Sequence, residues 1–251
     1  RDPDCQTTIN DLFERARNPE RIFVGVCLQI VPETDKDCLV DTTARPDQLR
    51  VKEFHVRDAR GVCWARNRTQ KLWAGEEYTL QIDSHMRFKP GWDETLLRML
   101  KTRPGRSVIT TYPPGFTPPR NLVLNHFPKP TAGNYDDNRI LVFGSFAYTD
   151  VDLPAKPMLH AFLAAGFVFG PSSIIRDVPY DPFLYFNGEE ASMAVRLWTN
   201  GYDLYAPNRA ILYHNYERHS APRHWSDDKD WGKISDRSFE RLRHMFGTEP
   251  A

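Results

Sequence analysis

The sequence lacks a charge excess of either sign and any long hydrophobic run. Lysine plus arginine and aspartate plus glutamate number 33 each, so the formal net charge at pH 7 is zero. A nucleic-acid-binding protein usually carries a basic excess, which this chain does not have. No apolar segment approaches the roughly 20 residues of a membrane-spanning helix, and no signal peptide is recognisable. We therefore expect neither a nucleic acid nor a membrane among the partners.

The sequence is also poor in cysteine. Four cysteines are scattered along 251 residues and form no CxxC pair. A chain of this length does not need a disulfide framework to hold its fold. We therefore interpret the thiols as reduced and expect a cytoplasmic protein, with Cys27 and Cys63 in the core.

No internal repeat is present, and the balance of 40% apolar and 26% charged residues is that of an ordinary globular protein. Strand-like and helix-like patterns alternate, which predicts a wound, mostly parallel α/β sheet flanked by helices. The proline-rich segment 113–130 and the polar segment 217–234 are expected to be loops, the second a candidate lid. Strands are predicted over 21–30, 49–56, 77–82, 107–112, 139–148 and 210–214, and helices over 8–16, 61–73, 94–100, 189–199 and 238–246.

The most informative motif is Asp83-Ser84-His85, which follows the strand-like segment 77–82. His214 likewise ends a predicted strand. Ligands of open α/β sheets bind beyond the carboxyl ends of the strands, so these side chains are candidates for one metal site. A carboxylate and two imidazoles would leave positions on the ion for phosphate oxygens, and the nitrogen ligands favour Mn²⁺ over Mg²⁺. The residues alone leave two alternatives open, an Asx turn at Asp83 and an ordinary core or surface role for His214.

Several segments, in order, resemble motifs of retaining GT-A glycosyltransferases, in particular the polypeptide N-acetylgalactosaminyltransferases. Asp83-Ser84-His85 resembles their metal motif, and His214 falls where they have the third metal ligand. Residues 60–66 resemble a stretch whose arginine lies near the nucleotide. The other matching segments are 165–169, which resembles the part beside the donor sugar, and 187–190 with 196–198, which resemble Gly-Gly-Glu-Asn followed by Arg-Ile-Trp.

Over nearly its full length the chain resembles a neighbouring group more closely. These are the cytoplasmic glycosyltransferases that attach N-acetylglucosamine to hydroxyproline of Skp1, with their bacterial relatives. The resemblance implies a single GT-A domain over residues 1–251, with a nucleotide-binding half (1–112) and an acceptor-side half (113–251). It also implies retaining transfer from UDP-GlcNAc, with Mn²⁺ or Mg²⁺, to a hydroxyl of a glycan or of a protein hydroxyproline, serine or threonine. The segments that carry it are 1–3, 21–27, 80–85, 91–93 and 188–190.

The resemblance assigns roles to single residues. Glu189 and Glu190 would be the catalytic carboxylates, although acidic residues at a helix start are also explained by the helix dipole. The metal ligands would be Asp83, His85 and His214. The donor contacts would come from Asp2, Gln29, Arg66, Asp83, Gly166 and Arg218.

The sequence departs from these two groups in one place each. A strand precedes the Arg-Asp-Pro turn in the Skp1-type family, whereas this sequence begins at the turn. We expect either that an upstream segment has been removed or that the nucleotide pocket lacks part of its floor. The polypeptide N-acetylgalactosaminyltransferases have an arginine three residues after their last metal ligand. Glu217 stands there in this chain, which leaves Arg218 as the candidate for that phosphate contact.

Two other functions compete with glycosyl transfer. Two histidines and a carboxylate also form the facial triad of non-haem iron oxygenases. Those enzymes usually present His-x-Asp and a distant His on a β-barrel, whereas this chain has Asp-x-His on an α/β pattern. A non-catalytic nucleotide-sugar or glycan-binding protein is the other alternative, and a turnover assay would separate it from an enzyme.

Overall fold

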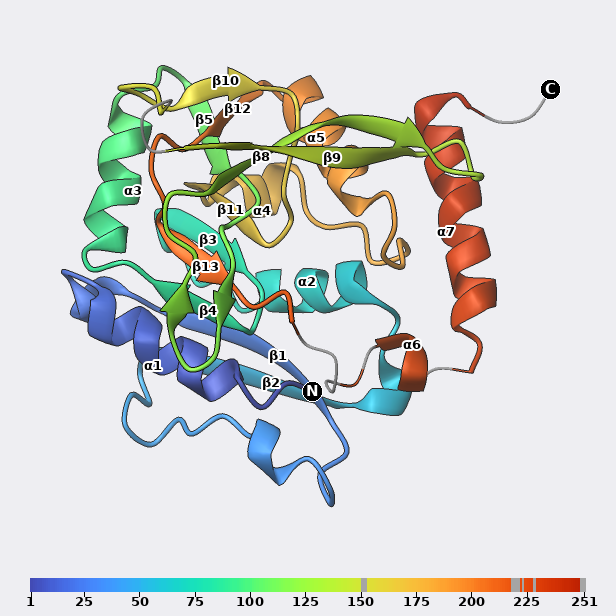
Figure 1. Ribbon diagram of the computed structural model, residues 1–251. Coiled ribbons are helices and arrows are strands. Elements are labelled where there is room, and N and C mark those ends of the chain that lie inside the picture. The colour runs from blue at the N-terminus through green and yellow to red at the C-terminus, as the bar shows by residue number, and fades with distance from the viewer. Residues whose placement is uncertain (150–152, 218–221, 223, 228, 249–251) are drawn as a thin grey trace.

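The chain folds around a central mixed sheet with helices on both sides (Figure 1). The computed structural model describes residues 1–149, 153–217, 222, 224–227 and 229–248. Five strands form the central sheet in the order β10-β12-β5-β11-β3. Their bounds are Tyr78–Ile82 for β3, Arg106–Thr110 for β5, Met158–His160 for β10, Phe167–Pro171 for β11 and Tyr202–Ala206 for β12.

The other strands of the described residues form two-stranded units. β1 (Val24–Ile30) runs parallel to β2 (Leu49–His55), with Val24 opposite Leu49. Two hairpins follow in the middle of the chain, and the longer one, β8–β9, lies across the top of the molecule in Figure 1. The remaining strands are β4 (Met86–Phe88), β6 (Phe116–Thr117), β7 (Asn121–Leu122), β8 (Phe127–Tyr135), β9 (Leu141–Tyr148) and β13 (Leu212–His214), where β13 pairs antiparallel with β4.

The strand directions correct the expectation of a mostly parallel sheet. Within the central sheet only β5 and β12 are parallel, whereas β11 runs antiparallel to both β3 and β5 and β10 runs antiparallel to β12. The β1–β2 pair is parallel as expected. An apolar run indicates a buried strand, but its direction and neighbours depend on contacts that are distant in the sequence. The sheet is therefore mixed.

Helices cover the sheet with faces that their sequences specify. In α3 (Trp92–Lys101), Trp92, Leu96 and Met99 are buried on one side, and acidic residues in the first turn and basic ones in the last complement the helix dipole. Trp92 is a core residue, and its indole N–H donates to the carbonyl of Leu12 at 2.9 Å. The other α-helices are α1 (Cys5–Arg15), α2 (Val62–Gln70), α4 (Ser173–Asp177), α5 (Glu189–Thr199), α6 (His224–Asp227) and α7 (Trp231–Phe246).

Two apolar cores lie on opposite faces of the central sheet. Successive residues of β11 alternate between them, because side chains of a strand point to opposite faces: Phe167 and Phe169 join one core and Val168 the other. The first core packs against α1 and α3. The second packs against α4, α5 and α7. None of the helices in the described part of the chain is both long enough and apolar enough to cross a membrane.

The element predictions succeed best where the pattern is strongest. The predicted helix 189–199 coincides with α5. The strand β12 was not predicted, and the expected loop 113–130 contains β6, β7 and the start of β8. The expected lid 217–234 contains α6 and the start of α7, and parts of it lie outside the described residues. All four cysteines are free thiols, and Cys63 is buried whereas Cys27 is only half-buried.

Candidate metal centre

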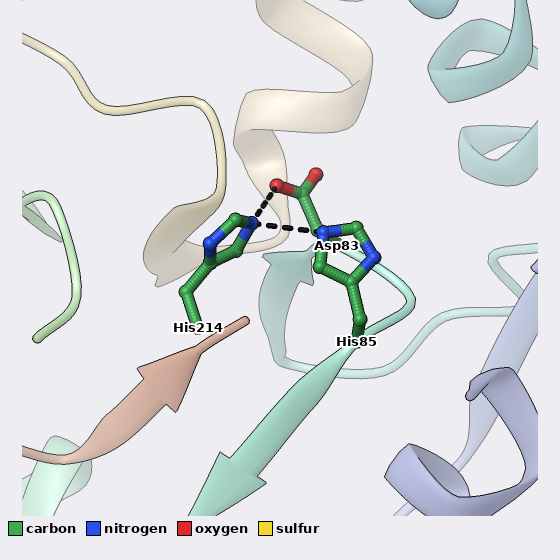
Figure 2. A group of neighbouring side chains, drawn as sticks. All are labelled: Asp83, His85 and His214. Atoms are coloured by element: carbon green, nitrogen blue, oxygen red, sulfur yellow. Dashed lines mark hydrogen bonds and ion pairs between the residues drawn. The ribbon is translucent and has the colours of Figure 1, made fainter. Parts of the chain in front are cut away.

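Three strand ends bring Asp83, His85 and His214 together (Figure 2). Asp83 follows β3 directly, and His85 precedes β4. His214 is the last residue of β13, and the antiparallel register of β13 and β4 places it opposite Met86. The pairing of these two short strands therefore positions two histidines that are 129 residues apart in the sequence.

The three side chains present one ligand atom each to a common point. His85 Nε2 lies 2.9 Å from His214 Nε2, and His214 Nε2 lies 3.2 Å from Asp83 Oδ2. One ligand atom from each of the three residues lies within 4.8 Å of the others. Two imidazole nitrogens and one carboxylate oxygen form a mixed N/O donor set that suits Mn²⁺, Fe²⁺ or Zn²⁺. The residues present thus fit a divalent ion.

A buried carboxylate orients His85 toward this point. Asp2 is buried, and its Oδ2 accepts from His85 Nδ1 at 2.7 Å and from Ser84 Oγ at 2.6 Å. A proton held on Nδ1 by a carboxylate leaves Nε2 free as a metal ligand, an arrangement common around bound metals. The structure therefore places Asp2, predicted as a donor contact, behind His85, a candidate metal ligand.

Arg66 connects Asp83 with Glu189. From α2, its Nη2 donates to Asp83 Oδ1 at 3.0 Å and its Nη1 donates to Glu189 Oε1. Burial alone would raise the pKa of Asp83, but the hydrogen bond from His214 and the charge of Arg66 hold it well below its usual range. Asp83 is therefore ionised at neutral pH and can serve as an anionic ligand.

Glu189, at the start of α5, is buried and has a second partner besides Arg66. Cys63 Sγ lies 3.3 Å from Glu189 Oε2. Burial raises the pKa of the Cys63 thiol to about 12, so the thiol stays protonated and donates to the carboxylate. Both oxygens of Glu189 are thus bonded within the protein.

Glu190 occupies a different environment from its neighbour. Its Oε1 accepts from the backbone N–H of Ala165 at 2.8 Å, and its Oε2 accepts from the hydroxyl of Tyr112 at 2.8 Å. Burial raises the pKa of Glu190 above its ordinary value. The adjoining Gly166 leaves room for Asp83, because a Cβ at this position would lie 2.9 Å from Asp83 Oδ2. Gly166 and Glu190 therefore belong to the same site as Asp83, a candidate metal ligand.

Comparison with known protein families shows to which family the chain belongs. The family model described as glycosyltransferase (GlcNAc) matches residues 1–54 and 40–251. The chain belongs to this glycosyltransferase family. None of the curated proteins matches it.

Solved structures show the same fold as this family member. One of them is described as a crystal structure of GalNAc-T7 with UDP, GalNAc and Mn²⁺. It aligns with a TM-score of 0.65 at 15% sequence identity, over 97% of this chain and 52% of that one. The likeness confirms the predicted GT-A fold, and the chain spans about half the length of that structure. Non-haem iron oxygenases usually present their metal ligands on a β-barrel, and the GT-A fold therefore argues against that alternative.

Two predicted donor contacts of this glycosyltransferase family member, Gln29 and Arg218, stay predictions. Gln29 sits near the carboxyl end of β1, half-buried and opposite Phe54 of β2. Among the described residues, no hydrogen bond joins Gln29 to the three metal-ligand candidates. Arg218 lies outside the described residues.

Two tyrosines of this site were not predicted from the sequence. Tyr112 follows β5 and bonds Glu190, and the ring of Tyr216 lies 4.2 Å from that of His214, measured between centroids. Tyr216 also donates to the carbonyl of Pro113 at 2.8 Å. The strand-end rule that selects Asp83 would also select Tyr112, because both residues follow strands of the same sheet. The signal was therefore present in the sequence.

Proposed function

We propose that this protein is a metal-dependent, retaining glycosyltransferase that moves N-acetylglucosamine from UDP-GlcNAc to a hydroxyl acceptor. The observation that carries the proposal is the convergence of Asp83, His85 and His214 in a member of a glycosyltransferase family. The crystal structure of GalNAc-T7, which has the same fold and holds UDP, GalNAc and Mn²⁺, supports a nucleotide donor and a manganese ion. The acceptor class that we propose is a protein hydroxyproline, serine or threonine, or a glycan, in the cytoplasm.

The metal ligands would hold a divalent cation whose chemistry suits a diphosphate leaving group. Asp83, His85 and His214 would bind Mn²⁺ or Mg²⁺, which supplies Lewis acidity to phosphate oxygens without transferring a proton. Arg66, fixed by two carboxylates, places a permanent positive charge next to the same point. In this proposal its guanidinium adds a charge-assisted hydrogen bond to the departing diphosphate.

We assign different roles to Glu189 and Glu190. Glu190 borders Gly166 and Tyr112, so we assign it the sugar hydroxyls or the acceptor hydroxyl. Glu189 is bonded to Arg66 and Cys63, so it positions the arginine. Gly166 lets a sugar approach the backbone closely, while Gln29 and Arg218 remain candidates for the nucleoside and the phosphates. Retention by front-face attack requires no covalent nucleophile of the glycosidase type.

A donor screen tests this function. Purified protein is incubated with Mn²⁺ and UDP-GlcNAc, UDP-GalNAc or UDP-glucose, and UDP release is measured. We expect release from UDP-GlcNAc to exceed the other two, and chelation of the metal to abolish it. Equal release from all three donors would contradict the sugar assignment. Donor binding without any release, with or without candidate acceptors, would instead support a binding protein.

A further inference from the structure

The backbone of His214 is held on both of its sides. On one side β13 pairs with β4, and His214 lies opposite Met86. On the other side His214 forms a parallel bridge with Gly115, and its own N–H donates to the carbonyl of Pro114 at 2.9 Å. The position of this candidate metal ligand therefore depends on Pro114 and Gly115 as well as on β4.

Pro114 and Gly115 lead into the β6–β7 hairpin, which is very short. Each of its strands has two residues, and the pairing is extended by one bond from the N–H of Val123 to the carbonyl of Gly115 at 2.9 Å. Phe116 of β6 is buried and joins Tyr213 of β13 in a small apolar cluster. An isolated two-stranded hairpin is at best marginally stable. Contacts with the rest of the protein must therefore keep this hairpin in place.

Two arginines bond the turn of the hairpin to its surroundings. Arg120, in the turn, donates through Nη1 to the carboxylate of Asp11 and through Nη2 to the carbonyl of Phe88 at 2.5 Å. Arg87 of β4 donates through Nε to the carbonyl of Pro119, in the same turn, at 3.0 Å. The turn is thus attached to β4 by two separate side chains.

Helix α1 and the residue before it supply the carboxylates that hold both arginines. Arg87 is buried and forms a two-pronged ion pair with Asp4, with Nη1 3.0 Å from Oδ2 and Nη2 2.8 Å from Oδ1. Asp11 is also buried, and it accepts from the N–H of Phe88 at 2.5 Å as well as from Arg120. Arg120, Asp11 and Phe88 therefore form a closed ring of hydrogen bonds. Bidentate arginine pairs fix geometry as well as charge, and buried carboxylates require such partners.

We propose that Arg87 and Arg120 are positioning residues for the metal centre. They fix the β6–β7 hairpin to α1 and β4, so that Pro114 and Gly115 hold His214 where its imidazole meets the other two candidate ligands. The effect passes through the backbone, because both guanidinium groups bond to carboxylates and to carbonyl oxygens. The inference rests on the proposed function, since it concerns a ligand of the proposed divalent ion.

The variant Arg120→Met tests this inference, because methionine removes both donors and keeps an unbranched side chain. Mn²⁺ affinity is measured by isothermal titration, and the EPR spectrum of bound Mn²⁺ reports its ligand geometry. We expect the affinity to fall about tenfold, the lower limit for loss of an outer partner of a metal ligand, and the zero-field splitting to change. In metal-free protein the backbone amide of His214 should exchange with solvent about tenfold faster.

The matched control is Arg106→Met. Arg106 likewise donates to a carboxylate, that of Asp177, and to a backbone carbonyl, that of Asn200 at 3.1 Å. It is the first residue of β5, whereas Tyr112 of the site follows the other end of that strand. We expect Arg106→Met to lower the Tm without changing the Mn²⁺ affinity or the exchange of the His214 amide.

A second variant keeps the inference testable if Arg120→Met does not fold. Arg87→Lys retains a positive charge beside Asp4, but a single ammonium group does not reproduce the planar fork that also reaches Pro119. We expect the same changes in Mn²⁺ affinity and in amide exchange, each several-fold.

The possible outcomes separate the inference from the proposed function. Weaker Mn²⁺ binding and faster His214 exchange in the two test variants, with wild-type values in Arg106→Met, would support the inference. Wild-type Mn²⁺ affinity in both test variants would overturn it, even if the amide exchanged faster. Equal losses in Arg106→Met would also overturn it, because a general loss of stability would then explain them. Failure of the wild-type chain itself to bind Mn²⁺ would instead contradict the proposed function.

Discussion

The metal centre and the cavity between β1 and β3 border the same strand but have opposite characters. At the carboxyl end of β3, Asp83 has hydrogen-bond partners on both of its oxygens. Along its length, β3 lines a cavity of about 460 Å³ whose walls are mostly apolar. Charge-assisted hydrogen bonds pre-organise the metal centre. The cavity, in contrast, is a space that protein atoms do not fill, whereas protein interiors are usually close-packed. The arrangement of the site is thus defined by polar contacts around Asp83.

The largest effect should come from removing a metal ligand. We predict that Asp83→Ala reduces Mn²⁺ affinity and UDP release by more than the roughly 10–100-fold that loss of an outer partner costs. Isothermal titration and the UDP assay measure both quantities. Asp137→Ala is the matched control, because Asp137 is exposed and lies on the β8–β9 hairpin. Unchanged Mn²⁺ affinity in Asp83→Ala would show that Asp83, His85 and His214 do not form a metal site.

A smaller effect is expected from the carboxylate behind His85. Asp2→Asn removes the acceptor charge that fixes the His85 tautomer. Mn²⁺ affinity should fall roughly 10–100-fold, while His126→Ala, a change to an exposed histidine, should leave it unchanged. If Asp2→Asn weakens only UDP-sugar binding and leaves the Mn²⁺ affinity normal, Asp2 contacts the donor directly and does not act through His85.

Crowding at Gly166 gives a weaker test of the same region. In Gly166→Ala the new Cβ meets Asp83 Oδ2 at 2.9 Å, so the carboxylate must move. We predict a several-fold loss of Mn²⁺ affinity with little change in Tm. Gly232→Ala is the control, because a Cβ there meets no atom within 4 Å. Equal Mn²⁺ affinity in the two variants would mean that Asp83 tolerates displacement.

The smallest effect concerns stability and its dependence on pH. Because burial raises the pKa of Glu190 above its ordinary 4.5, the folded state binds this proton more tightly than the unfolded state. The free energy of unfolding contributed by Glu190 is therefore greatest below pH 4.5 and declines as the pH rises through the folded pKa. Glu190→Gln should gain stability relative to wild type between pH 4 and pH 7 in denaturant titrations. A stability difference that is constant with pH would contradict the raised pKa.

The contrast between the two regions also marks what the sequence could predict. Asp83, His85 and His214 were predicted because each follows a strand and because ligands gather at strand ends. The bond between Asp2 and His85 was not predicted, since no local pattern signals a contact across 83 residues. The strands β10 and β11 and their antiparallel pairing were not predicted for the same reason. Periodicity reveals which residues are buried, whereas pairing depends on the assembled chain.

One measurement tests the central claim most directly. A crystal of the protein soaked with Mn²⁺ and UDP would be examined for anomalous scattering from manganese. The ion should lie among Asp83 Oδ2, His85 Nε2 and His214 Nε2, with diphosphate oxygens completing its coordination. Manganese found at any other position, with these three side chains unchanged, would contradict the account.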